Sequence, residues 1–172
     1  MSFYSFQGRV RAPEFKKNLV WYNTAAPLEL QKLRGKIVLL DFWTYCCINC
    51  MHILPDLKKL EQRYPDQLVV IGVHSPKFEN EKVEKNVQQA LLRYQIEHPV
   101  VCDPDMSQWQ AFGVRAWPTV ALVDPDGYVV GLWAGEGNLE ILNAQIADLI
   151  EGYRAKNKLN ETPLHFQREA LQ

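Results

Sequence analysis

The chain has 172 residues, a length that suits one domain with a hydrophobic core of its own. Its 19 Lys and Arg residues nearly balance its 20 Asp and Glu residues, so no overall charge draws it to nucleic acid or to an anionic membrane. No stretch is long and apolar enough for a transmembrane helix, and residues 1–11 lack the unbroken apolar core of a signal peptide, which together predict a cytoplasmic protein without a membrane partner.

The first strongly patterned part of the chain is an apolar strand followed by a helix. Residues 36–43 form a continuous apolar run, which predicts a strand buried on both faces of a parallel sheet. Residues 48–64 carry leucines at helical spacing, and Pro55 is expected to kink this helix. A second apolar run over 68–74 predicts a neighbouring buried strand. Residues 13–35 predict only a short edge element and a turn.

The second half of the chain predicts another helix, a short strand and then a β-hairpin. Apolar residues at helical spacing predict an amphipathic helix over 83–94. Two strands over 118–123 and 128–134 flank Asp-Pro-Asp-Gly, a strong turn signal. Asn138 is placed to cap a last helix that runs to Leu149. Strands that alternate with helices and end in a hairpin predict an α/β fold with a mixed central sheet and helices on both faces.

Three of the four cysteines fall within five positions, at Cys46, Cys47 and Cys50. Such clustering indicates local redox or metal chemistry rather than a disulfide framework. Cys47 falls where a helix begins, and the unpaired N–H groups there favour a thiolate. Cys50 lies one helical turn further on and can resolve a mixed disulfide formed by Cys47. A zinc site would need four ligands and only Cys46 and His52 are nearby, so no metal is expected.

Two further features favour redox chemistry. Asp41 interrupts an apolar strand, and a carboxyl group buried near Cys50 could take or give the proton when that thiol attacks. The alternative is a partly exposed, hydrogen-bonded aspartate at the end of the strand. Pro118, between Trp117 and Thr119, suits a cis peptide bond in a tight turn, and the alternative is a trans proline at an edge.

These motifs occur in an order and spacing that resemble the thioredoxin signature, namely Asp41-Phe-Trp43, Cys47-x-x-Cys50, Pro55 and Trp117-Pro118-Thr119. The resemblance implies a thioredoxin-like fold over residues 13–152 and thiol–disulfide exchange as the activity. It implies catalytic roles for Cys47 as the nucleophile, Cys50 as the resolving thiol and Asp41 as the assisting acid. It also implies a substrate-binding surface beside the active site, formed by Trp43, Trp117 and Pro118.

A more specific likeness surrounds the cysteine pair. The run Thr44-Tyr-Cys-Cys-Ile-Asn-Cys50, followed by Leu54-Pro-Asp-Leu57, is similar to the thioredoxin-like domain of NHL-repeat proteins. In that family a β-propeller follows the domain, which implies a propeller partner within a longer native chain. Residues 1–12 are then a lead-in and 153–172 a polar tail or linker. A helix-bearing insert over 75–103 goes beyond a minimal thioredoxin.

The expected activity is that of a thiol–disulfide oxidoreductase without a cofactor, which acts on protein disulfides or dithiols and uses an unknown electron donor. Ile48-Asn49 stand in place of the Gly-Pro of thioredoxin, so the direction of exchange stays open. One alternative is a peroxidase, because Thr44-x-x-Cys47 resembles the peroxiredoxin motif, with Leu40 in place of its proline and Arg115 as the candidate arginine. The other is a non-enzymatic binding module that presents the Trp117-Pro118 face to a partner.

Overall fold

Two continuous apolar runs, Ile37–Trp43 (β4) and Leu68–His74 (β5), form the centre of the sheet, and every residue on them is buried. The computed structural model describes residues 3–4 and 9–166. The remaining strands are β1 (Phe3–Tyr4), β2 (Val10–Arg11), β3 (Trp21–Tyr22), β6 (Val100–Cys102), β7 (Thr119–Val123) and β8 (Tyr128–Ala134). Their order is β1-β8-β7-β4-β5-β6-β3, and β2 also pairs with β8. Because β4, β5 and β6 are parallel while β7 and β8 are antiparallel, the predicted mixed sheet is confirmed.

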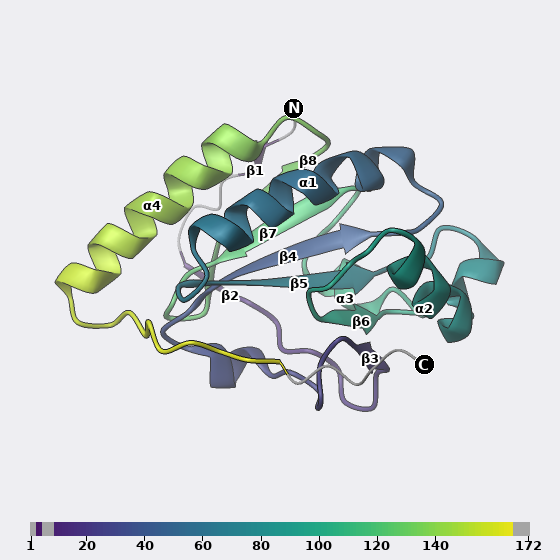
Figure 1. The fold of residues 1–172 in the computed structure, drawn as a ribbon, viewed down its shortest axis with the longest axis horizontal. Helices are drawn as coiled ribbons and strands as arrows, with labels where there is room; N and C mark the ends of the chain where they lie inside the picture. Colours follow the sequence, from purple (N-terminus) through teal and green to yellow (C-terminus); the bar gives the residue numbers. More distant parts are fainter. Residues whose placement is uncertain (1–2, 5–8, 167–172) are drawn as a thin grey trace.

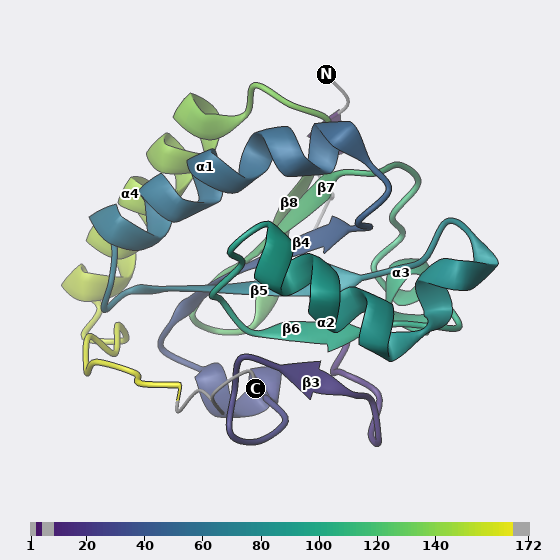
Figure 2. The ribbon, with the colours of Figure 1, turned by 45° about the vertical axis from the view of Figure 1, so that its right-hand side comes forward.

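Helices cover both faces of this sheet (Figure 1). They are the α-helices α1 (Ile48–Arg63), α2 (Glu84–Arg93), α3 (Ser107–Ala111) and α4 (Leu139–Ala155), and the short 3-10 helices η1 (Leu30–Leu33) and η2 (Glu79–Lys82). Alternate residues of β4 divide the core: Ile37 and Leu39 pack with α1 and α4, whereas Val38 and Leu40 pack with η1 and α3 on the other face. Figure 2 shows α1 and α4 lying side by side over one part of the sheet, with α2 covering β5 and β6.

The insert over 75–103 contains η2, α2 and β6, so the predicted helix-bearing insert is present. It follows directly from β5 and returns to the sheet as β6, which pairs with β5 in parallel. The segment therefore extends the sheet and brings η2 to the end of the molecule at which β4 and β5 finish (Figure 1).

The N-terminal part of the chain is more ordered than its sequence indicates. Within the expected lead-in over 1–12, β1 and β2 both pair with β8 in antiparallel fashion. Two-residue strands are too short to show an alternating pattern, which explains why the sequence predicts only a loose segment. The predicted boundary between lead-in and domain stays a prediction.

The C-terminal part also differs from the sequence-based expectation. Helix α4 continues past Gly152 to Ala155, and the buried Tyr153 donates a hydrogen bond from its hydroxyl to Asp126 at 3.0 Å. Beyond the helix, the Asn160 amide donates to the Gly35 carbonyl at 2.8 Å. Each of these contacts joins two distant parts of the chain, so the polar composition of the C-terminal segment does not predict them.

The turn at the hairpin follows its sequence signal, whereas the predicted helix cap does not. Gly127 adopts a φ of 90°, and its amide donates to the Asp124 carbonyl at 2.9 Å. Asn138 occupies the N-cap position of α4 but makes no side-chain capping bond. Its side-chain amide donates instead to the carbonyls of Ala134 and Gly135, each at 3.3 Å. The asparagine therefore fastens the preceding loop rather than the helix end.

Candidate active site

Cys47 is the N-cap residue of α1, directly after the loop that leaves β4. Its backbone is extended, and its Sγ accepts a hydrogen bond from the Cys50 amide at 3.2 Å. This position places the sulfur against the unpaired N–H groups and the positive end of the helix dipole. The side chain is only partly buried, so a disulfide on another molecule can approach the sulfur.

Cys50 and Asp41 form the buried side of the site. Cys50 is completely buried, and its pKa is raised first by that burial and then by its hydrogen bond with Cys47. Asp41 is also completely buried, and neither of its carboxylate oxygens has a hydrogen-bond partner among the described residues. Burial raises the pKa of Asp41 to about 7, and its charge further raises the pKa of Cys50. The exposed, hydrogen-bonded aspartate considered from the sequence is therefore not what the structure contains.

Aromatic rings support the loop that carries the cysteines. Trp43 meets His74 edge to face, with ring centroids 4.9 Å apart, and Tyr45 stacks on His74 with ring centroids 5.4 Å apart. Burial lowers the pKa of His74 to about 4, so the ring is neutral near pH 7 and its Nε2 can accept from the Tyr45 amide at 3.4 Å. The Trp43 side chain is 1% exposed and belongs to the core around Cys50, and its contact with substrate stays a prediction.

Trp117 packs against the apolar cluster that contains Cys50, whereas the Pro118 side chain that follows it is buried. The Trp117–Pro118 peptide bond is cis, as the sequence predicts. The Trp117 side chain is partly exposed and packs against the same cluster of Trp43 and Cys50 that Cys47 contacts. Its Nε1 donates to the Ser75 carbonyl at 2.8 Å. The structure thus brings together a partly exposed thiol, a buried thiol with an acid, and an apolar ring.

Sequence reasoning missed two buried acidic residues, Glu81 and Asp103. Glu81 is 1% exposed, and one of its oxygens accepts from the Cys46 amide at 3.4 Å while the other accepts from Phe78 at 2.7 Å. It lies in a charged run, Glu79-Asn-Glu-Lys82, which reads as a solvated surface. Asp103 is completely buried but sits in Asp-Pro-Asp, which reads as a turn.

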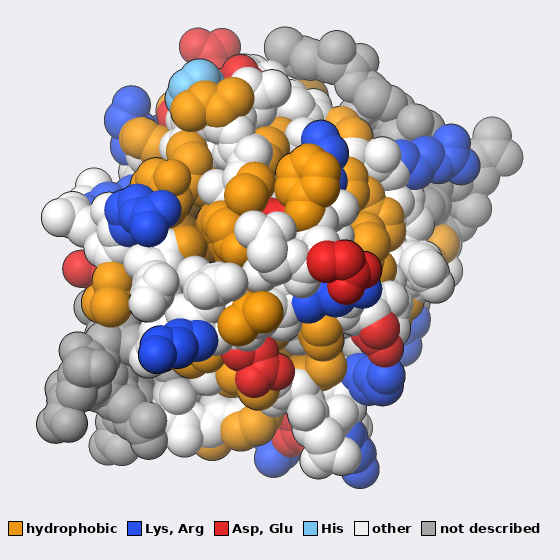
Figure 3. All heavy atoms as spheres, turned by 90° about the vertical axis from the view of Figure 1, so that its right-hand side faces the viewer, with side chains coloured by type: hydrophobic (Ala, Val, Ile, Leu, Met, Phe, Trp, Pro, Cys, Tyr) orange, Lys and Arg blue, Asp and Glu red, His pale blue; other side chains and the backbone are white. Residues whose placement is uncertain are grey.

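The surroundings of the site are mainly apolar at the end of the molecule to which β4 and β5 point (Figure 3). Ile48, the first residue of α1, is 67% exposed, and Phe78 in the insert is 53% exposed. Among the described residues no group of three or more His, Cys, Asp or Glu side chains could hold a metal ion. In the same part of the chain, no helix is long and apolar enough to cross a membrane.

A family model described as thioredoxin-like matches residues 35–129, which is more than half of the chain. A crystal structure of a thioredoxin-like superfamily protein superimposes with a TM-score of 0.75 at 29% identity and covers 81% of this chain and 96% of that one. The chain therefore belongs to the thioredoxin-like family.

Curated relatives agree with this assignment. Protein SUPPRESSOR OF QUENCHING 1, chloroplastic, of Arabidopsis thaliana is 51% identical over 93% of this chain, and NHL repeat-containing protein 2 of Bos taurus is 47% identical over 92%. The chain spans 15% and 23% of the lengths of these two proteins. Thiol-disulfide oxidoreductase ResA of Halalkalibacterium halodurans is 30% identical over 87% of this chain and 83% of its own length. The predicted likeness to NHL-repeat proteins is confirmed.

Proposed function

We propose that this domain is a thiol–disulfide oxidoreductase that acts on protein disulfides, with Cys47 as the nucleophile and Cys50 as the resolving thiol. One observation carries the proposal: Cys47 caps α1 with a reachable sulfur, while Cys50 lies completely buried behind it near Asp41. A thiol exposed at a helix N-terminus can attack, and a buried thiol one turn away can only meet a partner that the first has captured. The relative named as a thiol-disulfide oxidoreductase supports this assignment.

The reaction proceeds in two steps that balance. The Cys47 thiolate attacks a substrate disulfide, forms a mixed disulfide and releases one substrate thiolate. Asp41 then accepts the proton of Cys50, whose sulfur attacks Cys47 Sγ and releases the second substrate thiolate. The substrate gains two electrons and the domain is left with a Cys47–Cys50 disulfide, which a dithiol reductant of unknown identity must reduce before the next cycle. Run in reverse, the same steps oxidise a substrate.

Trp117 and Pro118 supply the surface on which the substrate lies in this proposal. Trp117 packs against the same apolar cluster as Cys47, and its partly exposed indole offers apolar area to a chain that enters the site, whereas the Pro118 side chain is buried. The peroxidase alternative finds less support, because Thr44 is completely buried and its hydroxyl lies 3.5 Å from His74 Nε2. A threonine held in this way does not present its hydroxyl at the surface to a peroxide bound on Cys47.

The test is reduction of insulin disulfides by the domain with dithiothreitol as the electron source. Cys47→Ser is expected to abolish the reduction, because the attacking sulfur is gone. Cys50→Ser is expected to accumulate a mixed disulfide on Cys47 that mass spectrometry detects. Cys102→Ser is the matched control, since this thiol is buried on β6 and not on the helix that carries the cysteine pair. Full activity of Cys47→Ser would refute the proposal, and inactivity of the wild type would favour a binding module.

Two wider expectations belong to the native protein rather than to this domain. A β-propeller partner in the same chain is supported by the relative that is named for its NHL repeats and is much longer than this chain. A cytoplasmic location rests only on the sequence, and the word chloroplastic in the name of another relative speaks against assigning one compartment. Both stay predictions.

A further inference from the structure

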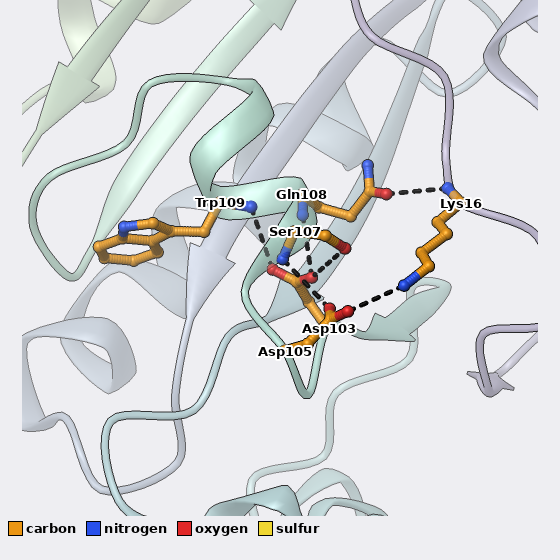
Figure 4. Close-up of polar contacts among 6 residues, drawn as sticks. All are labelled: Lys16, Asp103, Asp105, Ser107, Gln108 and Trp109. Atoms are coloured by element: carbon orange, nitrogen blue, oxygen red, sulfur yellow. Dashed lines mark hydrogen bonds and ion pairs between the residues drawn. The ribbon is translucent and has the colours of Figure 1, made fainter.

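The Asp103 carboxylate is buried in the turn between β6 and α3 and accepts four hydrogen bonds, of which Figure 4 shows those from Ser107, Gln108 and Trp109. Oδ1 accepts from the Gln108 amide at 3.0 Å and from the Ser107 hydroxyl at 3.4 Å. Oδ2 accepts from the Trp109 amide at 3.0 Å and from the Ser75 hydroxyl at 2.7 Å. The proposed chemistry uses none of these groups, so the network calls for another explanation than catalysis.

Two of the residues that share Oδ2 hold the same ring. The Ser75 carbonyl accepts from Trp117 Nε1 at 2.8 Å, and the Trp109 ring packs against the Trp117 ring with centroids 4.1 Å apart. Trp117 is therefore fixed at its polar edge by Ser75 and at its face by Trp109. Both supports are in turn fixed by one oxygen of Asp103, which lies in a different element from Trp117.

We propose that Asp103 is a positioning residue that holds the Trp117 indole beside Cys47 and so sets the affinity for an extended polypeptide substrate. The inference rests on the proposed function, because it assumes that a substrate chain lies against Trp117 and Pro118. A surface that is already rigid loses less conformational entropy when a ligand binds, so release of the indole weakens substrate binding. The reaction at sulfur is untouched, since no member of the network contacts Cys47 or Cys50 through a described hydrogen bond.

The discriminating variant is Asp103→Asn, which keeps the shape of the side chain but only one of its two acceptor oxygens. A carboxamide has one acceptor oxygen, so its NH2 group must face N–H or O–H donors on one side. We expect the KM for insulin to rise about fivefold, while the rates of Cys47 alkylation by iodoacetamide and of reduction of a small aromatic disulfide change less than about twofold. Ser75→Ala is the milder variant if Asp103→Asn fails to fold, and it is expected to act in the same direction.

Asp105→Asn is the matched control, because Asp105 is an exposed carboxylate that pairs with Lys16 at 2.8 Å and touches the Asp103 network only through the Ser107 amide, at 3.2 Å, among the described residues (Figure 4). The indole N–H resonance of Trp117 in an NMR spectrum gives a readout without turnover: it is expected to shift in Asp103→Asn and Ser75→Ala but not in Asp105→Asn. If the wild type fails to reduce insulin, the proposed function falls while this resonance still tests the positioning. An unshifted Trp117 resonance together with an unchanged KM in Asp103→Asn would overturn the inference. A fall in the Cys47 alkylation rate as large as the loss in substrate affinity would also overturn it.

Discussion

Asp41 is the residue whose surroundings bear most directly on the chemistry. A carboxyl group without a partner in the core is costly when charged, and burial therefore holds its pKa at about 7. An acid with that pKa exists in both protonation states near neutral pH, which suits a group that receives a proton and returns it. Its place on β4 brings it close enough to Cys50 for its charge to raise the pKa of that thiol.

The Asp41→Asn variant tests this role through the resolution step. With a preformed mixed disulfide on Cys47, we expect the wild-type release rate to rise as the pH increases through about 7, because the carboxylate that accepts the proton then forms. The variant should lack this inflection and should be slower at pH 8 by about 10²-fold. Stopped-flow detection of the released thiol measures both. An inflection that survives in the variant would assign it to another group.

The Asp41→Asn variant also tests how stability depends on pH: the wild type should lose stability over the pH range in which its release rate rises. Because the folded pKa of Asp41 is raised from 3.8 to about 7, its contribution to the free energy of unfolding is present below pH 4 and is lost as the pH rises to about 7. Relative to the variant, wild-type stability should fall by about 1.4 kcal/mol per pH unit across that window. Urea unfolding at several pH values gives the comparison, and a constant difference would contradict the buried acid.

At the scale of elements, η2 holds the loop that carries the cysteines in place through hydrogen bonds. The buried Glu81 carboxylate joins the Cys46 amide to Phe78, and the Tyr45 hydroxyl donates to the Asn80 carbonyl at 3.2 Å. Burial and then the charge of Glu81 raise the pKa of the Cys46 thiol. The contacts with η2 therefore favour the protonated form of the thiol next to Cys47, which in the proposed mechanism would limit its competition with Cys50.

Glu81→Gln is expected to weaken the attachment of this loop to η2. Loss of charge-assisted hydrogen bonds should lower the free energy of unfolding by about 1–2 kcal/mol, and the Cys46 thiol should be alkylated faster at pH 7. Urea unfolding and mass spectrometry of iodoacetamide-labelled peptides measure the two effects. Glu79→Gln is the control, since that side chain is 89% exposed and pairs only with Lys82 among the described residues. Equal behaviour of the two variants would remove Glu81 from this role.

At the scale of the whole molecule, the segment after α4 returns to the residues that precede β4 and is hydrogen-bonded to them. The Lys36 side chain is 2% exposed, and its Nζ donates to the backbone carbonyls of Asp66 and Thr162. Burial lowers the pKa of Lys36, the charges of Asp66 and Glu161 act in the opposite direction, and the two carbonyls accept hydrogen bonds from the ammonium group. Lys36 thus holds the segment that follows α4 close to the start of β4.

Lys36→Met should keep the apolar stem but free this segment. We expect faster hydrogen exchange of the Asn160 amide, which otherwise donates to Gly35, with the amides of β5 unchanged. Lys32→Met is the control, because that lysine is 80% exposed and pairs with Glu29. Exchange measured by mass spectrometry on the folded protein decides the matter, and an unchanged Asn160 amide would show that Lys36 is not the anchor.

Local sequence signals predicted the parts of this protein that depend on neighbours along the chain. The apolar runs of β4 and β5, the Asp-Pro-Asp-Gly turn and the helix that begins after Cys47 all follow from short-range patterns. The position of Pro118 after Trp117 was enough to predict the cis bond. Such features need no knowledge of what lies across the fold, because backbone preferences and burial on a strand or helix are encoded within a few residues.

The tertiary structure alone decided which polar side chains are buried and what they hold. The sequence singled out Cys47 and Cys50 as candidates, but it did not indicate the complete burial of Cys50, the lack of a hydrogen-bond partner for Asp41 among the described residues or the burial of Trp43. The same holds for Asp103, whose oxygen joins residues that are 28 and 6 positions away. The physical reason is that burial and long-range hydrogen bonds arise only when distant segments pack together, and composition within a segment carries no trace of that packing.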